Sequence, residues 1–231
     1  MKKIVTLSFD DGEIYDMQLT QLLRKYHLAA TFYLCSGFDG EHGVCKNGRP
    51  YQKMRLCDIE ATYRGFEIGS HSFLHRGVGD ANAEALRENI EKDIDLFSQY
   101  SERPVCCFAY PGGVATQSAI NTLSAFQPIR FARTVPTRRR SFLPPENPYY
   151  CIPTAHIFDP DMDMIISSFK SIESNQVQVL HIFGHSYEIA YHCNDGWKRM
   201  NQLFRRLAAI DAQFLCNADA YDIVFNSAKK K

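Results

Sequence analysis

Short apolar, β-branched segments alternate with amphipathic segments along most of the 231-residue chain. Strands are predicted over residues 4–9, 30–35, 66–70, 105–110, 129–135, 177–183 and 214–215. Helices are predicted over residues 16–27, 54–64, 83–100, 116–126, 161–172 and 197–210. Strands that alternate with helices in this way predict a parallel sheet with helices outside it.

The number of these units distinguishes two kinds of parallel sheet. About six or seven parallel strands with short connections favour a closed or nearly closed (β/α) barrel over an open sheet. The chain has no GxGxxG after its first strand and no GxxxxGK[ST], so the usual signs of a nucleotide-binding open sheet are absent. The length fits one α/β catalytic domain over residues 1–231.

The composition limits the partners and the compartment. The 26 basic and 26 acidic side chains balance, and no apolar segment reaches membrane-spanning length, so we expect neither a nucleic acid nor a membrane as partner. The first residues lack the apolar length of a signal peptide, which predicts a cytoplasmic protein, or an extracytoplasmic one if a leader has been removed. The eight cysteines, with no CxxC spacing, are expected to be reduced thiols.

Two adjacent carboxylates stand where the first predicted strand ends. Asp10 and Asp11 precede Gly12, and in α/β barrels this end of a strand carries the chemistry. The simpler interpretation is that one of them caps the following helix or shapes the turn. The stretch alone does not separate these two interpretations.

A second stretch offers metal ligands. His71 and His75 follow another predicted strand and, four residues apart, are expected on one face of a helical turn. With one aspartate from the first strand they make three ligands and leave a position for water, as in catalytic metal sites. Zn²⁺ is the expected ion, and Co²⁺, Ni²⁺ or Mn²⁺ would also fit these ligands. A carboxylate beside a metal-activated water could take its proton.

These two stretches resemble the first two motifs of the polysaccharide deacetylase family, carbohydrate esterase family 4, also called the NodB homology domain. Ser8-Phe9-Asp10-Asp11-Gly12 is similar to its TFDDG motif, and His71-Ser72-Phe73-Leu74-His75 to its H[ST]xxH motif. The resemblance implies a distorted (β/α) barrel. It also implies that Asp10 is the catalytic base and that Asp11, His71 and His75 hold the metal.

The third motif is matched more loosely. Phe108-Ala109-Tyr110-Pro111-Gly112-Gly113 stands where the family commonly has RxPYG, and it is close to the FAYPxG form. The resemblance implies that the backbone N–H of Gly112 stabilises the oxyanion. The arginine expected beside the base is replaced by Ala109, and we expect Arg133 on the next strand to supply that charge. The alternative is that Arg133 pairs with a surface acid.

The last motif of the family is a histidine near the end of a late strand. The resemblance makes His185 the expected general acid, with His181, on the same side of the strand, as the second candidate. The fourth motif, which brings an aspartate and a tryptophan beside this histidine, is not found. Glu188 and Asp159 are candidate partners for His185.

The resemblance implies metal-dependent N-deacetylation of an N-acetylated amino sugar or oligosaccharide. Two alternatives stay open: hydrolysis of another small amide or non-peptide C–N bond, and an inactive carbohydrate-binding relative. A homo-oligomer is compatible with the sequence. The proline-rich segment 136–153 is expected to be an extended loop, whose residues Arg138, Arg139, Arg140, Tyr149 and Tyr150 are solvated or meet another subunit more often than they bind an anionic sugar or phosphate.

Overall fold

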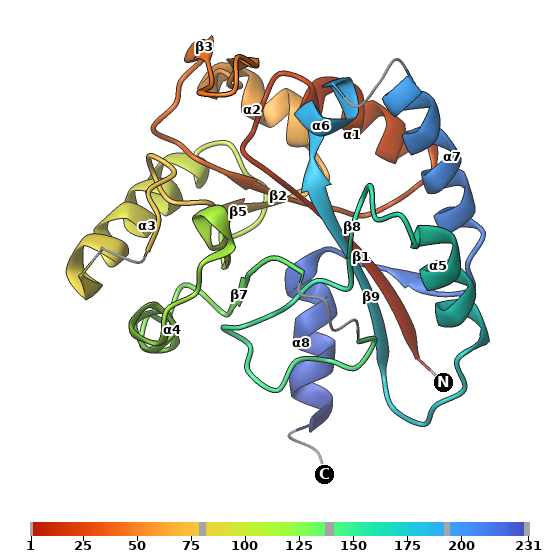
Figure 1. The fold of residues 1–231 in the computed structure, drawn as a ribbon. Coiled ribbons are helices and arrows are strands. Elements are labelled where there is room, and N and C mark those ends of the chain that lie inside the picture. Colours follow the sequence, from red (N-terminus) through yellow and green to blue (C-terminus); the bar gives the residue numbers. More distant parts are fainter. Residues whose placement is uncertain (1, 79–81, 137–140, 192–194, 229–231) are drawn as a thin grey trace.

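The first predicted strand is β1, Lys3–Asp10, in the middle of the main sheet (Figure 1). The computed structural model describes residues 2–78, 82–136, 141–191 and 195–228. Seven parallel strands follow in the order β7-β6-β5-β2-β1-β9-β8, and β10 pairs with the start of β1. Their bounds are β2 Thr31–Leu34, β5 Glu67–Ser70, β6 Cys107–Ala109, β7 Phe131–Arg133, β8 Ala155–His156, β9 Gln178–His185 and β10 Gln213–Phe214. This curled parallel sheet confirms the predicted distorted (β/α) barrel.

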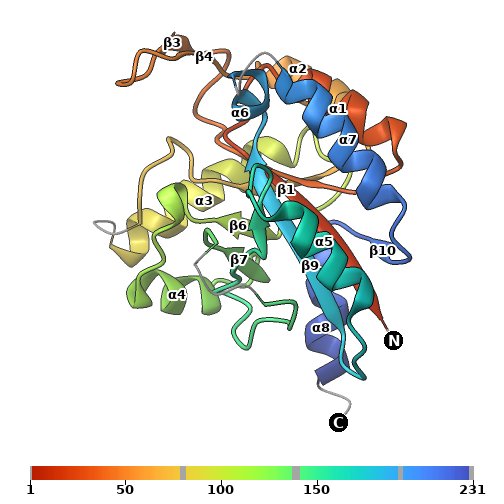
Figure 2. The same ribbon diagram turned by 45° about the vertical axis from the view of Figure 1, so that its right-hand side comes forward.

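Most helices lie outside the sheet, in two groups (Figure 2). Helices α1, α2, α5 and α7 pack against the outer side of β1, β2 and β9, whereas α3 and α4 pack against β6 and β7. Their bounds are α1 Asp16–Lys25, α2 Leu56–Tyr63, α3 Ala83–Phe97, α4 Gln117–Ser124, α5 Met162–Ser171, α6 Ser186–Tyr191, α7 Gly196–Ala208 and α8 Asn217–Ala228. No helix in the described part of the chain is long and apolar enough to span a membrane.

The side chains of β1 alternate between the helical layer and the barrel interior. Val5, Leu7 and Phe9 belong to the core cluster that includes the outer helices. The intervening residues Thr6 and Ser8, like Asp10, are polar, buried and directed to the interior. The strand that leads to the acidic pair therefore has a polar inner face, and the site at its end lies on that face.

The segment after β7 links the two edges of the sheet. Cys151 forms a parallel bridge with Arg133 of β7, and its N–H donates to the Ala132 carbonyl at 2.9 Å. Four residues later β8 begins and pairs in parallel with β9, with His156 opposite Phe183. The last part of the predicted loop 136–153 and the next residues thus belong to the barrel wall.

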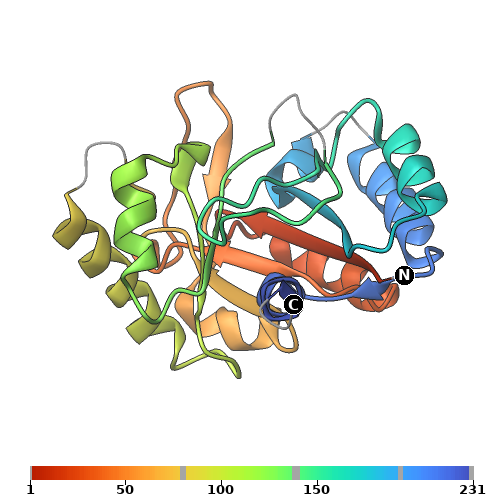
Figure 3. The same ribbon diagram turned by 90° about the horizontal axis from the view of Figure 1, so that it is seen from below.

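Helix α8 begins inside the barrel, and Figure 3 shows it end-on among the strands. Asn217 accepts a hydrogen bond from Thr6 Oγ1 at 2.6 Å and donates one to the Tyr33 hydroxyl at 2.9 Å. The Ala218 N–H donates to Glu67 Oε2 at 3.1 Å. The helix therefore fills the interior below the rim and satisfies the polar groups that face it.

Two parts of the fold differ from the sequence prediction. The segment between β2 and α2, for which no strand was predicted, contains a hairpin of β3, His42–Val44, and β4, Pro50–Gln52. The prediction missed β8 and α6, whose two and six residues are too few to show a periodicity, and it also missed the twelve-residue helix α8. Among the residues predicted for the loop 136–153, Arg138, Arg139 and Arg140 lie outside the described residues.

Candidate active site

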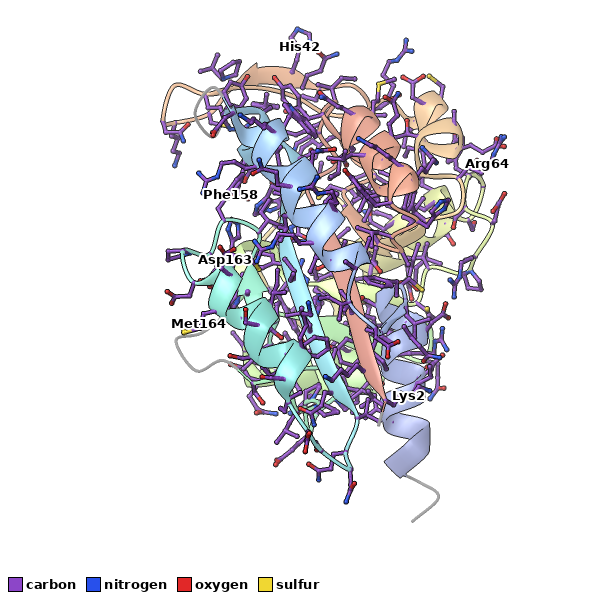
Figure 4. All side chains as sticks on the ribbon, turned by 90° about the vertical axis from the view of Figure 1, so that its right-hand side faces the viewer. Lys2, His42, Arg64, Phe158, Asp163 and Met164 are labelled. Carbon is purple, nitrogen blue, oxygen red and sulfur yellow. The ribbon has the colours of Figure 1, made fainter. Side chains whose placement is uncertain are left out.

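The carboxyl ends of the parallel strands meet at one end of the barrel, where the predicted site residues lie. Figure 4 shows His42, on the hairpin, at this end of the molecule and Lys2, just before β1, toward the other end. The hairpin packs beside the end of β1, because the Met54 N–H donates to the Gly12 carbonyl at 2.8 Å. The segment that carries the hairpin therefore shares this rim with the two aspartates.

The backbone turns sharply after Asp10 and separates the two carboxylates. Asp11 has a φ of 79° and Gly12 a φ of 59°, both in the left-handed region that glycine tolerates best. A side chain at Gly12 would also meet Leu34, because a Cβ there would lie 2.9 Å from Leu34 Cδ2. Asp10 therefore keeps the inward direction of the strand, while Asp11 reaches toward the histidines.

Asp11, His71 and His75 form a cluster that could hold a metal ion, with their ligand atoms within 4.8 Å of one another. Asp11 Oδ1 lies 3.7 Å from His71 Nε2 and 3.3 Å from His75 Nε2. His71 Nδ1 lies 2.8 Å from the Ala109 carbonyl, which can only accept, so Nδ1 donates and Nε2 keeps its lone pair toward Asp11.

The helical turn predicted for this histidine pair is wrong. Ser72 has a φ of 67° and His75 a φ of 52°, values that a right-handed helix excludes. A tight turn, in which the His75 N–H donates to the Ser72 carbonyl at 3.0 Å, brings the two rings together instead, with their centroids 4.8 Å apart. The four-residue spacing is compatible with either conformation, so the sequence did not distinguish them.

The protonation states at this cluster are those that a metal requires. Burial lowers the pKa of His71 to about 4, which keeps its imidazole neutral. Burial would raise the pKa of Asp11, but the positive charge of Lys53 and the nearby histidines outweigh it and lower the pKa to about 2. A neutral imidazole and an ionised carboxylate therefore face each other near neutral pH, and this donor set fits a divalent ion.

Asp10 lies beside this cluster and pairs with Arg133. The Arg133 guanidinium donates from Nη2 to Asp10 Oδ1 and from Nη1 to the Thr134 carbonyl at 2.9 Å. Both side chains of the pair are almost entirely buried, at 5% exposure for Asp10 and 1% for Arg133. The alternative that Arg133 pairs with a surface acid is therefore wrong, because its partner is the buried carboxylate of the first strand.

Arg133 reaches Asp10 from the strand next to the one that carries Ala109. The two residues are register partners of β6 and β7, so their side chains point to the same side of the sheet. The small side chain of Ala109 leaves space for the longer side chain of Arg133 to reach Asp10. The guanidinium carbon of Arg133 lies 5.0 Å from the ring centroids of Tyr33 and Phe183, and both contacts favour a cation at this position.

The structure brings His185 to the same rim and puts His181 below it. His185 is the register partner of Asp10. His185 Nδ1 lies 2.9 Å from Glu188 Oε2, whereas His181 contacts Ser8 Oγ at 2.9 Å and the Tyr221 hydroxyl at 3.1 Å. Burial and the charge of Arg133 hold the pKa of His181 well below its ordinary value.

Of the two candidate partners of His185, Glu188 makes the contact. Burial lowers the pKa of His185, but its hydrogen bond to Glu188 and the nearby carboxylates outweigh burial and raise it above the ordinary value. The Asp159 carboxylate accepts from the Asp161 N–H at 2.9 Å, within its own turn.

Gly112 follows β6 in a short 3₁₀ turn, Pro111–Gly113, with a φ of 65°.

A buried aspartate that the sequence analysis missed supports the histidine loop. Asp93 of α3 accepts hydrogen bonds from the Ser36 N–H at 2.9 Å, Ser36 Oγ at 2.6 Å and Ser70 Oγ at 2.6 Å. It thereby ties the ends of β2 and β5 together just before His71. An acid within an amphipathic helix resembles a solvated residue, so no sequence signal would have identified it.

Comparisons with known proteins give a family and several similar folds. A model of the family described as Polysaccharide deacetylase matches residues 1–127. No curated protein matches the sequence significantly.

Three solved structures illustrate the similarity of fold. A family 4 acetyl xylan esterase from Clostridium thermocellum, in complex with a cobalt ion, is 15% identical with a TM-score of 0.59, over 95% of this chain and 91% of that one. A family 4 carbohydrate esterase from Bacillus anthracis is 16% identical with a TM-score of 0.61, over 98% and 84%. A pseudoenzyme of the same esterase family from that organism is 14% identical with a TM-score of 0.60, over 94% and 65%.

The buried position of Asp93 predicts a pH-dependent effect on stability. Burial raises its pKa from 3.8 to about 6, so the folded state binds this proton more tightly than the unfolded state. The stability of the wild type relative to Asp93→Asn is therefore expected to fall by about 2 kcal/mol as pH rises from 4 to 6.5. Urea unfolding of both proteins across this range measures the difference. Asp95→Asn, at an exposed position of the same helix, is the control. A difference that is independent of pH would contradict the prediction.

Proposed function

Because the chain belongs to the polysaccharide deacetylase family, we propose that it is a metal-dependent hydrolase that removes the acetyl group from an N-acetylated amino sugar or oligosaccharide. The observation that carries this proposal is the separation of two adjacent carboxylates. Asp11 lies with His71 and His75, while Asp10 pairs with Arg133. One carboxylate can thus serve as a ligand while its neighbour serves as a base.

In this proposal Asp11, His71 and His75 hold a divalent ion, with Zn²⁺ as the expected metal and Co²⁺, Ni²⁺ or Mn²⁺ as alternatives. Such an ion would lower the pKa of a bound water and polarise the acyl oxygen. The Ala109 carbonyl fixes the ring of His71 from the opposite side and keeps Nε2 directed at the site.

Asp10 is proposed as the general base. Its Oδ1 accepts from Arg133, so Oδ2 is the oxygen left to take the proton of the attacking water. This contact restricts the rotation of the Asp10 carboxylate. Arg133 therefore performs, from the next strand, the function that the family assigns to the arginine replaced here by Ala109.

His185 is proposed as the general acid, protonating the leaving nitrogen from Nε2. The contact of Nδ1 with Glu188 leaves Nε2 as the transferring atom, and the raised pKa favours the protonated ring near neutral pH. The backbone N–H of Gly112 is the proposed donor to the oxyanion. His181 is less suited to this role because its contacts with Ser8 and Tyr221 occupy both ring nitrogens inside the barrel.

We predict that substitutions at the two aspartates have different effects. Asp10→Asn should lower kcat for acetate release from N-acetylglucosamine oligomers by at least about 10²-fold and leave zinc binding intact, because it removes the base but no ligand. Asp11→Asn should weaken zinc binding itself. Zinc content and acetate release, measured on the same preparations, separate the two effects, with Asp95→Asn as the control.

Three results would contradict this proposal. Full activity of Asp10→Asn on every substrate that the wild type hydrolyses would exclude Asp10 as the base. Binding of the oligomers without turnover, in wild type loaded with zinc, would support the inactive carbohydrate-binding alternative instead. Hydrolysis of small amides but not of N-acetylated sugars would support the other alternative.

The position of Arg133 predicts a rescue. Arg133→Ala should lower kcat at least tenfold and destabilise the fold, because it leaves Asp10 buried without its partner. Adding Ala109→Arg restores a guanidinium on the neighbouring strand, at the family's usual position, and should recover part of kcat. Steady-state kinetics and thermal unfolding of the single and double variants measure both effects. Unchanged activity in Arg133→Ala would show that Asp10 does not depend on this charge.

A further inference from the structure

We propose that His156 is a positioning residue, which holds Glu188 in the orientation that directs His185 toward the substrate. This inference rests on the proposed function, because it concerns the general acid of that reaction. His156 comes from β8, a strand that the sequence analysis did not predict, and it is not one of the residues that the family motifs carry.

A single carboxylate oxygen of Glu188 joins the two histidines. Glu188 Oε2 lies 2.9 Å from His156 Nε2, 2.9 Å from His185 Nδ1 and 3.0 Å from the His185 backbone nitrogen. A carboxylate can only accept, so all three nitrogens donate to this oxygen. Burial raises the pKa of Glu188, but its hydrogen bonds to the two histidines outweigh burial and lower the pKa, which keeps it ionised.

The next residues of the chain fix the protonation of His156. The Phe158 N–H donates to His156 Nδ1 at 3.2 Å, so this nitrogen carries the lone pair and the proton stands on Nε2. A tight turn, in which the Asp159 N–H donates to the His156 carbonyl at 2.9 Å, brings the Phe158 N–H to this position. His156 is therefore in the tautomer that donates to Glu188.

The ring of His156 is also held by packing. It meets the Phe183 ring edge-on with a centroid distance of 5.1 Å, and the Arg133 guanidinium carbon lies 5.0 Å from the centroid of the same Phe183 ring. His156 and Phe183 are register partners of β8 and β9. The closure of the barrel thus sets the position of His156 relative to His185.

The three side chains could also hold a metal ion, since their ligand atoms form a second cluster within 4.8 Å. The separations of 2.9 Å from Glu188 Oε2 to each ring are hydrogen-bond lengths. Ligand atoms around a tetrahedral Zn²⁺, at about 2.0 to 2.1 Å from the ion, stand roughly 3.3 Å apart. His156 Nε2 and His185 Nδ1 both donate to Glu188 Oε2, and these hydrogen bonds favour the metal-free arrangement of the three side chains.

Two substitutions at His156 test the proposal. His156→Leu removes the donor and should lower kcat for acetate release from N-acetylglucosamine oligomers about tenfold, with KM unchanged, because His185 loses its orientation and not its contact with substrate. His156→Gln offers an amide donor and should restore most of kcat. His27→Asn is the control, because His27 is exposed after α1 and asparagine tolerates its positive φ of 54°. Equal kcat in wild type and His156→Leu would overturn the proposal.

A second measurement does not depend on activity. Nitrogen chemical shifts from NMR of the wild type should show the proton of neutral His156 on Nε2, and the signal of His185 Nδ1 should change in His156→Leu. A proton on Nδ1 of His156, or a second bound zinc ion that His156→Leu removes, would overturn the proposal. If wild type hydrolyses no N-acetylated substrate, the proposed function fails, while these signals still report whether His156 orients His185.

Discussion

The ion pair between Arg133 and Asp10 is the interaction on which the rest of the site depends. Removing two such groups from water costs several kcal/mol for each ion, so the pair is not explained by stability alone. It is held by the Thr134 carbonyl and by two aromatic rings that face the guanidinium. It fixes the Asp10 carboxylate beside the cluster of Asp11, His71 and His75, and this separation is the basis of the different roles proposed for the two aspartates.

The barrel makes this pair possible by bringing together strands that are distant in sequence. Arg133 ends β7, near one edge of the sheet, whereas Asp10 ends β1 in the middle. The bridge from Arg133 to Cys151 and the pairing of β8 with β9 link the two edges across the interior. Below the pair, α8 supplies hydrogen-bonding partners to the polar inner faces of β1, β2 and β5. The same closure delivers His156 to Glu188.

The sequence predicted the parts of this arrangement that depend on local pattern. Alternating strands and helices indicated the barrel, and two motifs at strand ends indicated Asp10, Asp11, His71 and His75, whose roles stay predictions. The contact of Arg133 with Asp10 was expected because a charge was missing at Ala109 and the next strand offered one. Their proximity follows from the curl of the sheet, because β6, β5 and β2 separate β7 from β1 in the strand order.

Other features depend on how distant segments meet, which a single sequence does not encode locally. The turn between His71 and His75 has the same residue spacing as a helix. Strand β8 has two residues, and its pairing follows from the closure of the barrel. Asp93 looks like a surface acid until the ends of β2 and β5 pack against α3. Tertiary packing determined each of these features.

The central claim is that Asp11 is a metal ligand while its neighbour Asp10 is the general base. A crystal structure of the protein grown with Co²⁺ tests this claim most directly. We expect one anomalous peak at roughly 2.0 to 2.2 Å from a carboxylate oxygen of Asp11 and a nitrogen of each of His71 and His75. Asp10 should stay on Arg133 and outside the coordination sphere. An ion ligated by Asp10, or one bound only by His156, His185 and Glu188, would contradict it.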